Sequence, residues 1–307
     1  MKQLLFFCII TIFSICFCQF AAAQNNGVKK ETQILALGDS TVKINIYERK
    51  GARVTFVSPH HNEQIAVRLG REAIEKTGGR FVEIESLDEN GNGQRRLNFS
   101  FKGVNYSLDP NRIFTENGRQ CSHFAPEIEP MVKDFAEKFL KIILADGARL
   151  RDGERFLVAI HNNRDVDEQT ELAQKSRDLT TLSFSAGFAA MNLSQTEFHH
   201  QIEGVYLSNS EYDADNFVFV STPALMSFFI AEGFNVVLQK PAAKLQIKSC
   251  SVDDGSLSVF AGVRNIPYIN LEADAKFGEF RQRQMINAVY RLFYQQQRSV
   301  QQAKMKK

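Results

Sequence analysis

Apolar residues occur along this chain in short runs of strand type and in longer stretches with helical spacing. A run at residues 54–57 is followed by a stretch at residues 63–77 whose apolar positions share one helical face, and then by a second run at residues 81–84. Gly78 and Gly79 end the predicted helix. Strand, helix and strand in this order predict a crossover unit, which places the two strands in parallel in one sheet.

Similar patterns continue to the C-terminus. Residues 217–220 and 235–238 predict strands on either side of a helix at 224–232, and a helix at 127–145 precedes a buried-type run at 156–160. We therefore expect an α/β fold with a mainly parallel sheet, and no repeat or linker divides the chain. Further strands are predicted at residues 33–37, 42–47, 97–101, 104–108, 257–260 and 268–271, and a last helix begins near residue 278.

The first 23 residues have the pattern of a cleaved secretory signal peptide. Lys2 precedes an apolar run at residues 4–20, and three alanines follow it. A retained membrane span is the alternative, although polar residues interrupt the run. A lipid anchor on Cys16 or Cys18 is disfavoured, since a large residue precedes each cysteine. We expect a periplasmic or secreted protein whose residues 24–307 form a single domain with no membrane contact after cleavage.

The charge of the chain bears on its partners, and its cysteines bear on a possible disulfide. The net charge is +2, and no basic block precedes Lys304, so nucleic acid is not an expected partner. Outside the signal sequence the cysteines are Cys121 and Cys250. An exported protein can join them in a disulfide, but sequence does not give the distance between them, so isolated thiols remain an alternative.

His60 and Glu63 follow the predicted strand at residues 54–57 and form half of a metal site. Zinc in catalytic sites takes three nitrogen or carboxylate ligands from the protein, and a short spacer supplies two of them. His161 and Glu272 also follow apolar runs. Because ligands bind at the carboxyl ends of strands in open α/β sheets, these residues are predicted to converge. The alternative is that His60 and His61 are ordinary loop histidines.

Four motifs follow one another over nearly the whole mature chain: His60-x-x-Glu63, Asp109-Pro110-Asn111-Arg112-x-Phe114, His161, and Leu271-Glu272-Ala273-Asp274. In this order they resemble the zinc carboxypeptidase superfamily. This superfamily includes metallocarboxypeptidases, murein-peptide amidases and the succinylglutamate desuccinylase–aspartoacylase branch. The resemblance implies a phosphorylase/hydrolase-like three-layer α/β/α sandwich with a mixed, mainly parallel sheet, and a metallohydrolase activity.

The resemblance also implies a role for each site residue. His60, Glu63 and His161 would hold one zinc ion, and Glu272 would act as general base and then as proton donor to the leaving amine. Asp274 and Glu279 are rival bases.

Asn111 and Arg112 would bind a substrate carboxylate, for which a guanidinium fork is suited. Arg112 could instead form a structural ion pair with Asp109. Either Arg95 or Arg96 would stabilise the oxyanion, and the sequence does not choose between them.

Departures from the family pattern bear on the substrate. Asn62 stands where metallocarboxypeptidases often carry an arginine, and Asn162 after His161 resembles the aspartoacylase branch. Tyr206 and Tyr212 are candidates for a substrate-binding tyrosine. We expect the substrate to be a small peptide or N-acyl amino acid with a free carboxylate, and a cell-wall peptide would suit an exported enzyme. The alternative is a catalytically inactive zinc- or ligand-binding module of the same fold.

Other polar clusters are interpreted as structural. Residues 88–93 match the opening of a calcium loop, but the twelfth position is Phe99 where a bidentate glutamate is required, so a surface turn is expected. His123 and the pair His199-His200 have no partner at metal spacing. The acidic residues of 211–216 are predicted to form a solvated loop.

Overall fold

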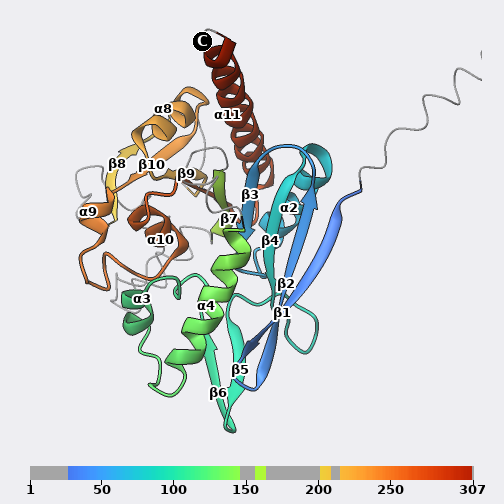
Figure 1. The fold of residues 1–307 in the computed structure, drawn as a ribbon, viewed down its shortest axis with the longest axis vertical. Coiled ribbons are helices and arrows are strands. Elements are labelled where there is room, and N and C mark those ends of the chain that lie inside the picture. The colour runs from blue at the N-terminus through green and yellow to red at the C-terminus, as the bar shows by residue number, and fades with distance from the viewer. Residues whose placement is uncertain (1–26, 146–155, 164–200, 209–214, 306–307) are drawn as a thin grey trace, which may run out of the picture.

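The computed structural model describes residues 27–145, 156–163, 201–208 and 215–305. The expected signal peptide, Tyr212, His199 and His200 lie outside these residues, as does most of the acidic segment. Within them, nine strands form one sheet in the order β1-β2-β4-β3-β7-β11-β9-β10-β8, and β5 and β6 form a separate hairpin (Figure 1).

The strands lie close to the predicted runs, except for β8, which no run predicted. In the large sheet they are β1 (Lys29–Leu37), β2 (Ser40–Arg49), β3 (Val54–Ser58), β4 (Gly79–Glu85), β7 (Phe156–Asn163), β8 (Ile202–Tyr206), β9 (Phe217–Val220), β10 (Asn235–Gln239) and β11 (Tyr268–Asp274), and the hairpin consists of β5 (Leu97–Phe101) and β6 (Val104–Leu108). The helices are α2 (Gln64–Thr77), α3 (Glu116–Cys121), α4 (Glu129–Ile143), α8 (Pro223–Ala231), α9 (Ala242–Leu245), α10 (Leu257–Val263) and α11 (Glu279–Met305).

The centre of the sheet is parallel and its flanks are mixed. β4, β3, β7 and β11 are neighbours that run in the same direction. β1, β2 and β4 pair antiparallel, and β9 is antiparallel to β11 but parallel to β10. The predicted mixed sheet with a parallel centre is confirmed. As a result, the carboxyl ends of β3, β7 and β11 lie together at one edge of the sheet.

Helices cover both faces of this sheet, which confirms the α/β/α layering. On one face α2, α8 and α11 pack against alternate strand residues, and on the other α4 and α10 do so together with the β5–β6 hairpin. Side chains of a strand alternate between the two faces, so each strand contributes to both apolar layers. Phe56 and Val158 lie in the first layer, and Val57 and Ala159 lie in the second.

The end of α2 shows why the sequence has two glycines there. Gly78 has φ +86°, and a Cβ on it would lie 2.7 Å from the carbonyl oxygen of Lys50. A side chain is therefore excluded both by backbone conformation and by space. The chain reverses at this point and enters β4 at once, which completes the predicted crossover unit.

Residues 257–260 are not a strand, as the apolar run predicted, but the start of helix α10. The hydroxyl of Ser256 accepts a hydrogen bond from the backbone N–H of Val259 and so caps the helix. Leu257, Val259 and Ala261 are buried on it. A run of four apolar residues fits a buried strand and a short buried helix equally well, so the capping serine was the signal that distinguished them.

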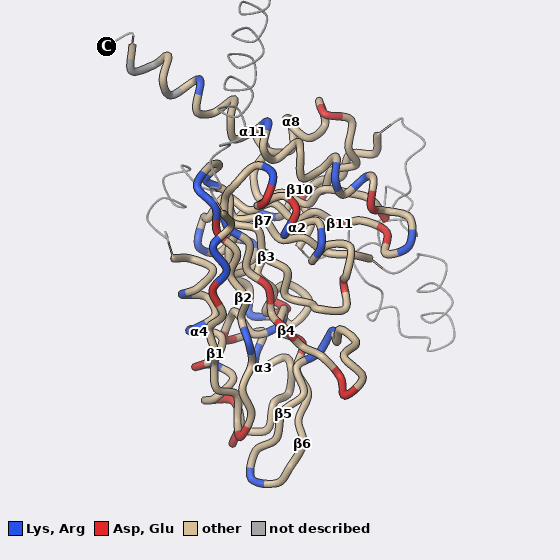
Figure 2. Tube along the Cα trace, turned by 90° about the vertical axis from the view of Figure 1, so that its right-hand side faces the viewer, with Lys and Arg blue, Asp and Glu red and all other residues tan. Residues whose placement is uncertain are grey.

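Cys121 and Cys250 form a disulfide with a Cα–Cα distance of 5.5 Å, which decides between the two alternatives for these cysteines. Residues 88–93 form the expected surface turn, in which the Asp88 carboxylate accepts the backbone N–H groups of Asn90 and Asn92. Both signs of charge are spread along the described trace (Figure 2). No helix among the described residues is long and apolar enough to span a membrane.

Candidate metal centre

The three predicted metal ligands meet at the carboxyl edge of the parallel strands. His60 and Glu63 lie in the turn between β3 and α2, and His161 lies on β7, which pairs in parallel with β3. His161 and Glu272 were expected just past the ends of their strands, but both lie within the last three residues of β7 and β11. The strands are longer than their apolar runs because backbone pairing continues through the polar residues.

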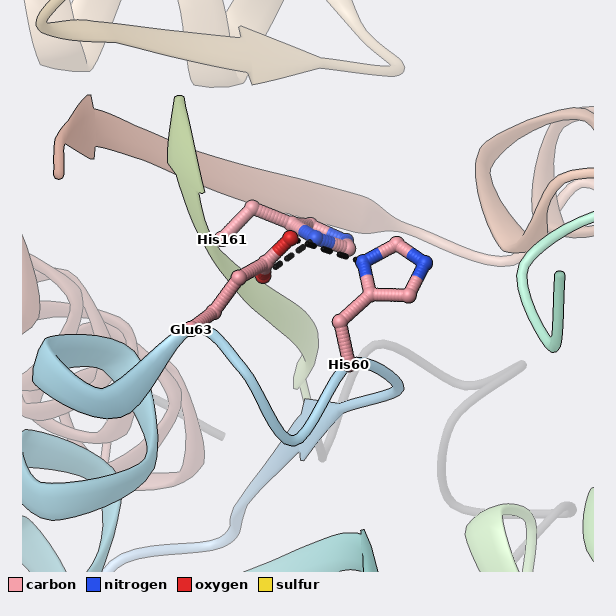
Figure 3. A group of neighbouring side chains, drawn as sticks. All are labelled: His60, Glu63 and His161. Carbon is pink, nitrogen blue, oxygen red and sulfur yellow. Dashed lines mark hydrogen bonds and ion pairs between the residues drawn. The ribbon is translucent and has the colours of Figure 1, made fainter. Parts of the chain in front are cut away.

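The carboxylate of Glu63 contacts both imidazole rings, whose centroids lie 5.2 Å apart (Figure 3). Its Oε1 lies 2.7 Å from Nδ1 of His60, and its Oε2 lies 2.9 Å from Nδ1 of His161. The ligand atoms of the three residues all lie within 4.8 Å of one another. Each residue is at most 5% exposed, so three metal-binding side chains share one small buried space.

This donor set fits a divalent ion such as zinc. Two imidazole nitrogens and one carboxylate are the protein ligands of a common catalytic zinc arrangement, which keeps a further position open. The residues therefore suit the metal in number, in chemical type and in separation.

Electrostatic coupling within the group is strong. Burial tends to raise the pKa of Glu63, but His60 and His161 outweigh burial and hold this pKa well below its ordinary value. Burial tends to lower the pKa of His60, but the carboxylates of Glu63 and Asp109 outweigh it and leave this pKa raised. Glu63 is thus kept ionised, as a metal ligand must be, while the protonated form of His60 is favoured, and a metal ion would have to displace that proton.

Asp109 contacts the His60 ring at Nε2, the nitrogen that does not face Glu63. The sequence did not predict this contact. Its Oδ1 lies 2.9 Å from Nε2 of His60 and accepts the backbone N–H of Asn111 at 2.8 Å. A carboxylate that takes Nε2–H fixes the ring orientation and leaves Nδ1 to face the ion. Burial raises the pKa of Asp109, but His60, followed by Arg95 and Arg112, holds it far below its usual range. The signal in the sequence was its place at the head of the Asp-Pro-Asn-Arg motif.

Asn162 and Gln282 connect the segment that carries Glu63 to the strand that carries His161 by hydrogen bonds. Asn162 Oδ1 accepts the backbone N–H of Ala66 in the first turn of α2, at 2.9 Å. Its Nδ2 donates to Gln282 Oε1 at 3.1 Å, and Gln282 Nε2 donates to the carbonyl of His161 at 2.7 Å. Both side chains are buried. This chain of hydrogen bonds holds α2, which follows Glu63, against β7, which carries His161.

Glu272 lies beside the three predicted metal ligands, His60, Glu63 and His161, which together are called the ligand group. It is the partner of His161 in the parallel β7–β11 register, so the two side chains project from the same face of the sheet. Its Oε1 accepts a hydrogen bond from Asn270 Nδ2 at 2.7 Å. Burial raises the pKa of Glu272; His161 opposes this effect and Glu63 adds to it, and the net shift is upward.

The rival bases have other functions in the fold. Asp274 accepts the backbone N–H of Lys276 at 2.8 Å and so closes the turn after β11. Glu279 pairs with Arg68 at 2.7 Å and with Arg283 at 3.2 Å on the surface. Of the three predicted carboxylates, Glu272 is the one that is paired in register with His161.

The structure separates the adjacent arginines. Nη1 of Arg95 lies 3.1 Å from Oε1 of Glu63, and its Nη2 lies 3.5 Å from Asp109. Arg96 points to the β5–β6 hairpin, where it donates to the hydroxyl of Ser107 at 2.9 Å and to its carbonyl at 3.0 Å. Arg95 therefore borders the site and Arg96 does not.

Asn111 and Arg112 lie next to the segment that leads into α10. The backbone N–H of Leu257 donates to Asn111 Oδ1 at 3.0 Å. Nη1 of Arg112 donates to the carbonyl of Asn111 at 2.9 Å and lies 3.4 Å from Asp254 Oδ2. An ion pair of Arg112 with Asp109 was the alternative to a substrate-binding role, and the structure pairs Arg112 with Asp254. Asp254, followed by Asp109 and Glu272, outweighs burial and raises the pKa of Arg112.

The remaining predicted residues lie outside the ligand group. His61 Nδ1 accepts the backbone N–H of Ser86 at 2.9 Å, so this histidine has a structural role. His123 is exposed and has φ +52°. Tyr206 is the last residue of the edge strand β8, away from the central strands that carry the ligands.

No known family model matches the sequence, and no curated protein matches it. Solved structures with a similar course of the chain include a candidate metallopeptidase from Shewanella baltica OS155, with 12% identity and a TM-score of 0.42 over 92% of this chain and 91% of its own. The N-formylglutamate amidohydrolase from Ralstonia eutropha JMP134 has 11% identity and a TM-score of 0.38, over 83% and 98% of the two chains. A candidate carboxypeptidase from Burkholderia mallei ATCC 23344 has 12% identity and a TM-score of 0.37, over 90% and 66%. At such low similarity, the chemistry of this chain has to be derived from its own side chains.

Proposed function

We propose that this protein is a zinc-dependent hydrolase that cleaves an amide bond in a small peptide or N-acyl amino acid with a free carboxylate. The observation that carries the proposal is the buried convergence of His60, Glu63 and His161, with Glu272 beside them in the β7–β11 register. A three-ligand set with an adjacent carboxylate of raised pKa is the arrangement that hydrolysis by an activated water requires.

Each residue then has a defined task. Zinc held by the three ligands would supply Lewis-acid activation of water and of the scissile carbonyl. Glu272 accepts the proton of the attacking water and passes it to the leaving nitrogen. Arg95, at the border of the site, donates hydrogen bonds to the oxygen on which negative charge develops.

The substrate carboxylate is assigned to Asn111 and Arg112. Asn111 Oδ1 is engaged by the N–H of Leu257, which turns its amide N–H₂ away from α10. Arg112 uses Nη1 for its contacts with Asn111 and Asp254, and among the described residues its Nε and Nη2 make no hydrogen bond. These donors are what a carboxylate needs for bidentate binding.

We also propose that the mature protein comprises residues 24–307 as one domain and works in the periplasm or outside the cell. The Cys121–Cys250 disulfide supports this location, because disulfides form and persist in oxidising compartments. A cell-wall peptide is a substrate of the proposed class that occurs there.

The test begins with metal analysis of purified residues 24–307. One zinc per chain is expected, and a His161→Ala variant should lose it. The zinc-loaded protein is then assayed against N-acyl amino acids, short peptides and murein peptides, each as the free acid and as the carboxyl amide. Hydrolysis of free acids alone supports the proposal. Stoichiometric zinc without any hydrolysis would instead identify a binding module.

A further inference from the structure

Residues 253–257, the segment that leads into α10, contact both residues of the proposed carboxylate clamp. Asp254 forms the ion pair with Arg112, and the N–H of Leu257 fixes the amide of Asn111. The segment also lies against the backbone of this clamp. The carbonyl of Gly255 accepts the N–H of Phe114 at 2.9 Å, and a Cβ on Gly255 would collide with the carbonyl of Arg112.

The same segment is attached to the first turn of α3. Thr115 Oγ1 donates to Asp253 Oδ1 at 2.5 Å, and Asn117 Nδ2 donates to the carbonyl of Asp253 at 3.1 Å. Gly118 lies directly against Gly255, so closely that a Cβ on Gly118 would overlap the Gly255 backbone. Side chains are excluded at this contact, which allows the two backbones to fit together.

The disulfide forms a second attachment between the same two parts. Cys121 is the last residue of α3, and Cys250 lies in the turn just before the segment. That turn is continuous with the segment, since the N–H of Asp253 donates to the carbonyl of Ser249 at 2.8 Å. Residues 253–257 are therefore attached to the start of α3 by the hydrogen bonds of Asp253. The turn that precedes them is attached to the end of α3 by the disulfide at Cys250.

We propose that Asp254 and the Cys121–Cys250 disulfide position the Asn111–Arg112 clamp for a substrate carboxylate. This inference rests on the proposed function. Fixing both donors before the substrate arrives reduces the ordering cost of binding. The proposed metal ligands lie on the β3–α2 turn and on β7, whereas the disulfide joins α3 to the turn before α10 and Asp254 pairs with Arg112. Loosening the segment should thus weaken substrate binding and leave the metal in place.

The first experiment measures steady-state kinetics of an Asp254→Asn variant. KM should rise about tenfold, equivalent to ~1.4 kcal/mol, while kcat and zinc content stay at the wild-type values. Glu203→Gln, which removes the exposed ion pair with Lys244, is the matched control and should change neither constant. A lower KM would show that Asp254 competes with the substrate for Arg112, and it would overturn the proposal.

The second experiment removes the disulfide with a Cys121→Ser/Cys250→Ser double variant. KM should rise in the same direction, with zinc content unchanged, and a dithiol reductant should reproduce this rise in the wild type but not in the variant. An unchanged KM in a double variant that remains folded by circular dichroism would exclude the disulfide from the positioning role. If the double variant does not fold, the reductant titration of the wild type gives the answer.

A third measurement does not depend on catalysis. Phenylglyoxal modifies accessible arginines, and peptide mass spectrometry can follow its rate at Arg112 with Arg96 as an internal reference. Both the Asp254→Asn variant and the double cysteine variant should react faster than wild type at Arg112 and equally at Arg96. A wild type without hydrolytic activity would refute the proposed function, whereas unchanged Arg112 rates would refute the positioning inference.

Discussion

Glu272 lies at the register position of His161, on the strand directly beside it. The two residues are Cα partners in the parallel β7–β11 pair, and both side chains project toward the face covered by α4 and α10. Regular backbone pairing therefore sets the distance between a proposed metal ligand and the proposed base, with no loop between them. A site built on adjacent strands is held more rigidly than one built on loops.

Replacing Glu272 separates metal binding from catalysis. The Glu272→Gln variant should keep its zinc, because Glu272 is not one of the three ligands, and should lose roughly 10²-fold or more in kcat, since the amide cannot accept a proton. Zinc analysis and turnover on the same sample test this prediction. The Glu279→Gln variant is the control, because Glu279 pairs with Arg68 on the surface. Wild-type turnover in Glu272→Gln would remove Glu272 from the proposed role.

The adjacent histidines should respond in opposite ways to substitution. His60→Ala removes a ligand and should abolish stoichiometric zinc. His61→Asn should retain the ion, because His61 faces the N–H of Ser86 and an asparagine oxygen can accept the same bond. Metal content after dialysis against metal-free buffer is the measurement. Loss of zinc in both variants to the same degree would contradict the ligand assignment.

Asp109 should tune the affinity for the ion without binding it. An Asp109→Asn variant loses the carboxylate that holds His60 Nε2 at 2.9 Å. We expect about a 10–100-fold weaker zinc affinity, which is typical when the outer partner of a histidine ligand is changed. Competition with a chromophoric chelator measures it. An affinity equal to wild type would mean that the position of His60 is set by other contacts.

Zinc affinity should depend on pH through His60. The carboxylates of Glu63 and Asp109 raise its pKa in the metal-free protein, and a protonated imidazole cannot bind the ion. Affinity should therefore increase with pH and keep increasing above the ordinary histidine value of about 6.5. In the Asp109→Asn variant, zinc affinity should stop increasing at a lower pH than in wild type, because one of the two carboxylates that raise the pKa of His60 is gone. Chelator competition across the pH range tests both statements.

Arg95 and Arg96 provide a matched pair. Arg95→Gln should lower kcat by about 10²-fold, the usual effect of losing an oxyanion donor. Arg96→Gln should have little effect, because Arg96 is bonded to Ser107 on the hairpin. Zinc content is measured in both variants, since Arg95 also contacts Glu63. Equal losses in the two variants would argue against the proposed role of Arg95.

The parallel centre of the sheet and the ligand group could be predicted because both follow from local patterns. Continuous apolar runs mark buried strands, and polar residues at their carboxyl ends converge once those strands are parallel. His60 and His161 were found by this reasoning together with the motif resemblance. The same reasoning could not give the length of β7 or β11, since pairing continues beyond the apolar residues.

What the sequence left open depends on contacts between distant segments. The choice between Arg95 and Arg96 is made by the β5–β6 hairpin, which takes up Arg96 through Ser107. Asp254 is separated from Arg112 by more than a hundred residues, and no local pattern joins them. The identity of α10 depended on one capping serine in a run too short to show a period.

Glu63 and His161 are 98 positions apart, and the chain between them contributes β4, the β5–β6 hairpin and α4. If these residues bind zinc as proposed, a chain in which β7 has not yet joined β3 would offer the ion only two of its three ligands. Ion uptake would then be a late step of folding, and an ion that binds the folded form alone would add to its stability by mass action. The acquired metal would then mark molecules whose central strands have assembled correctly.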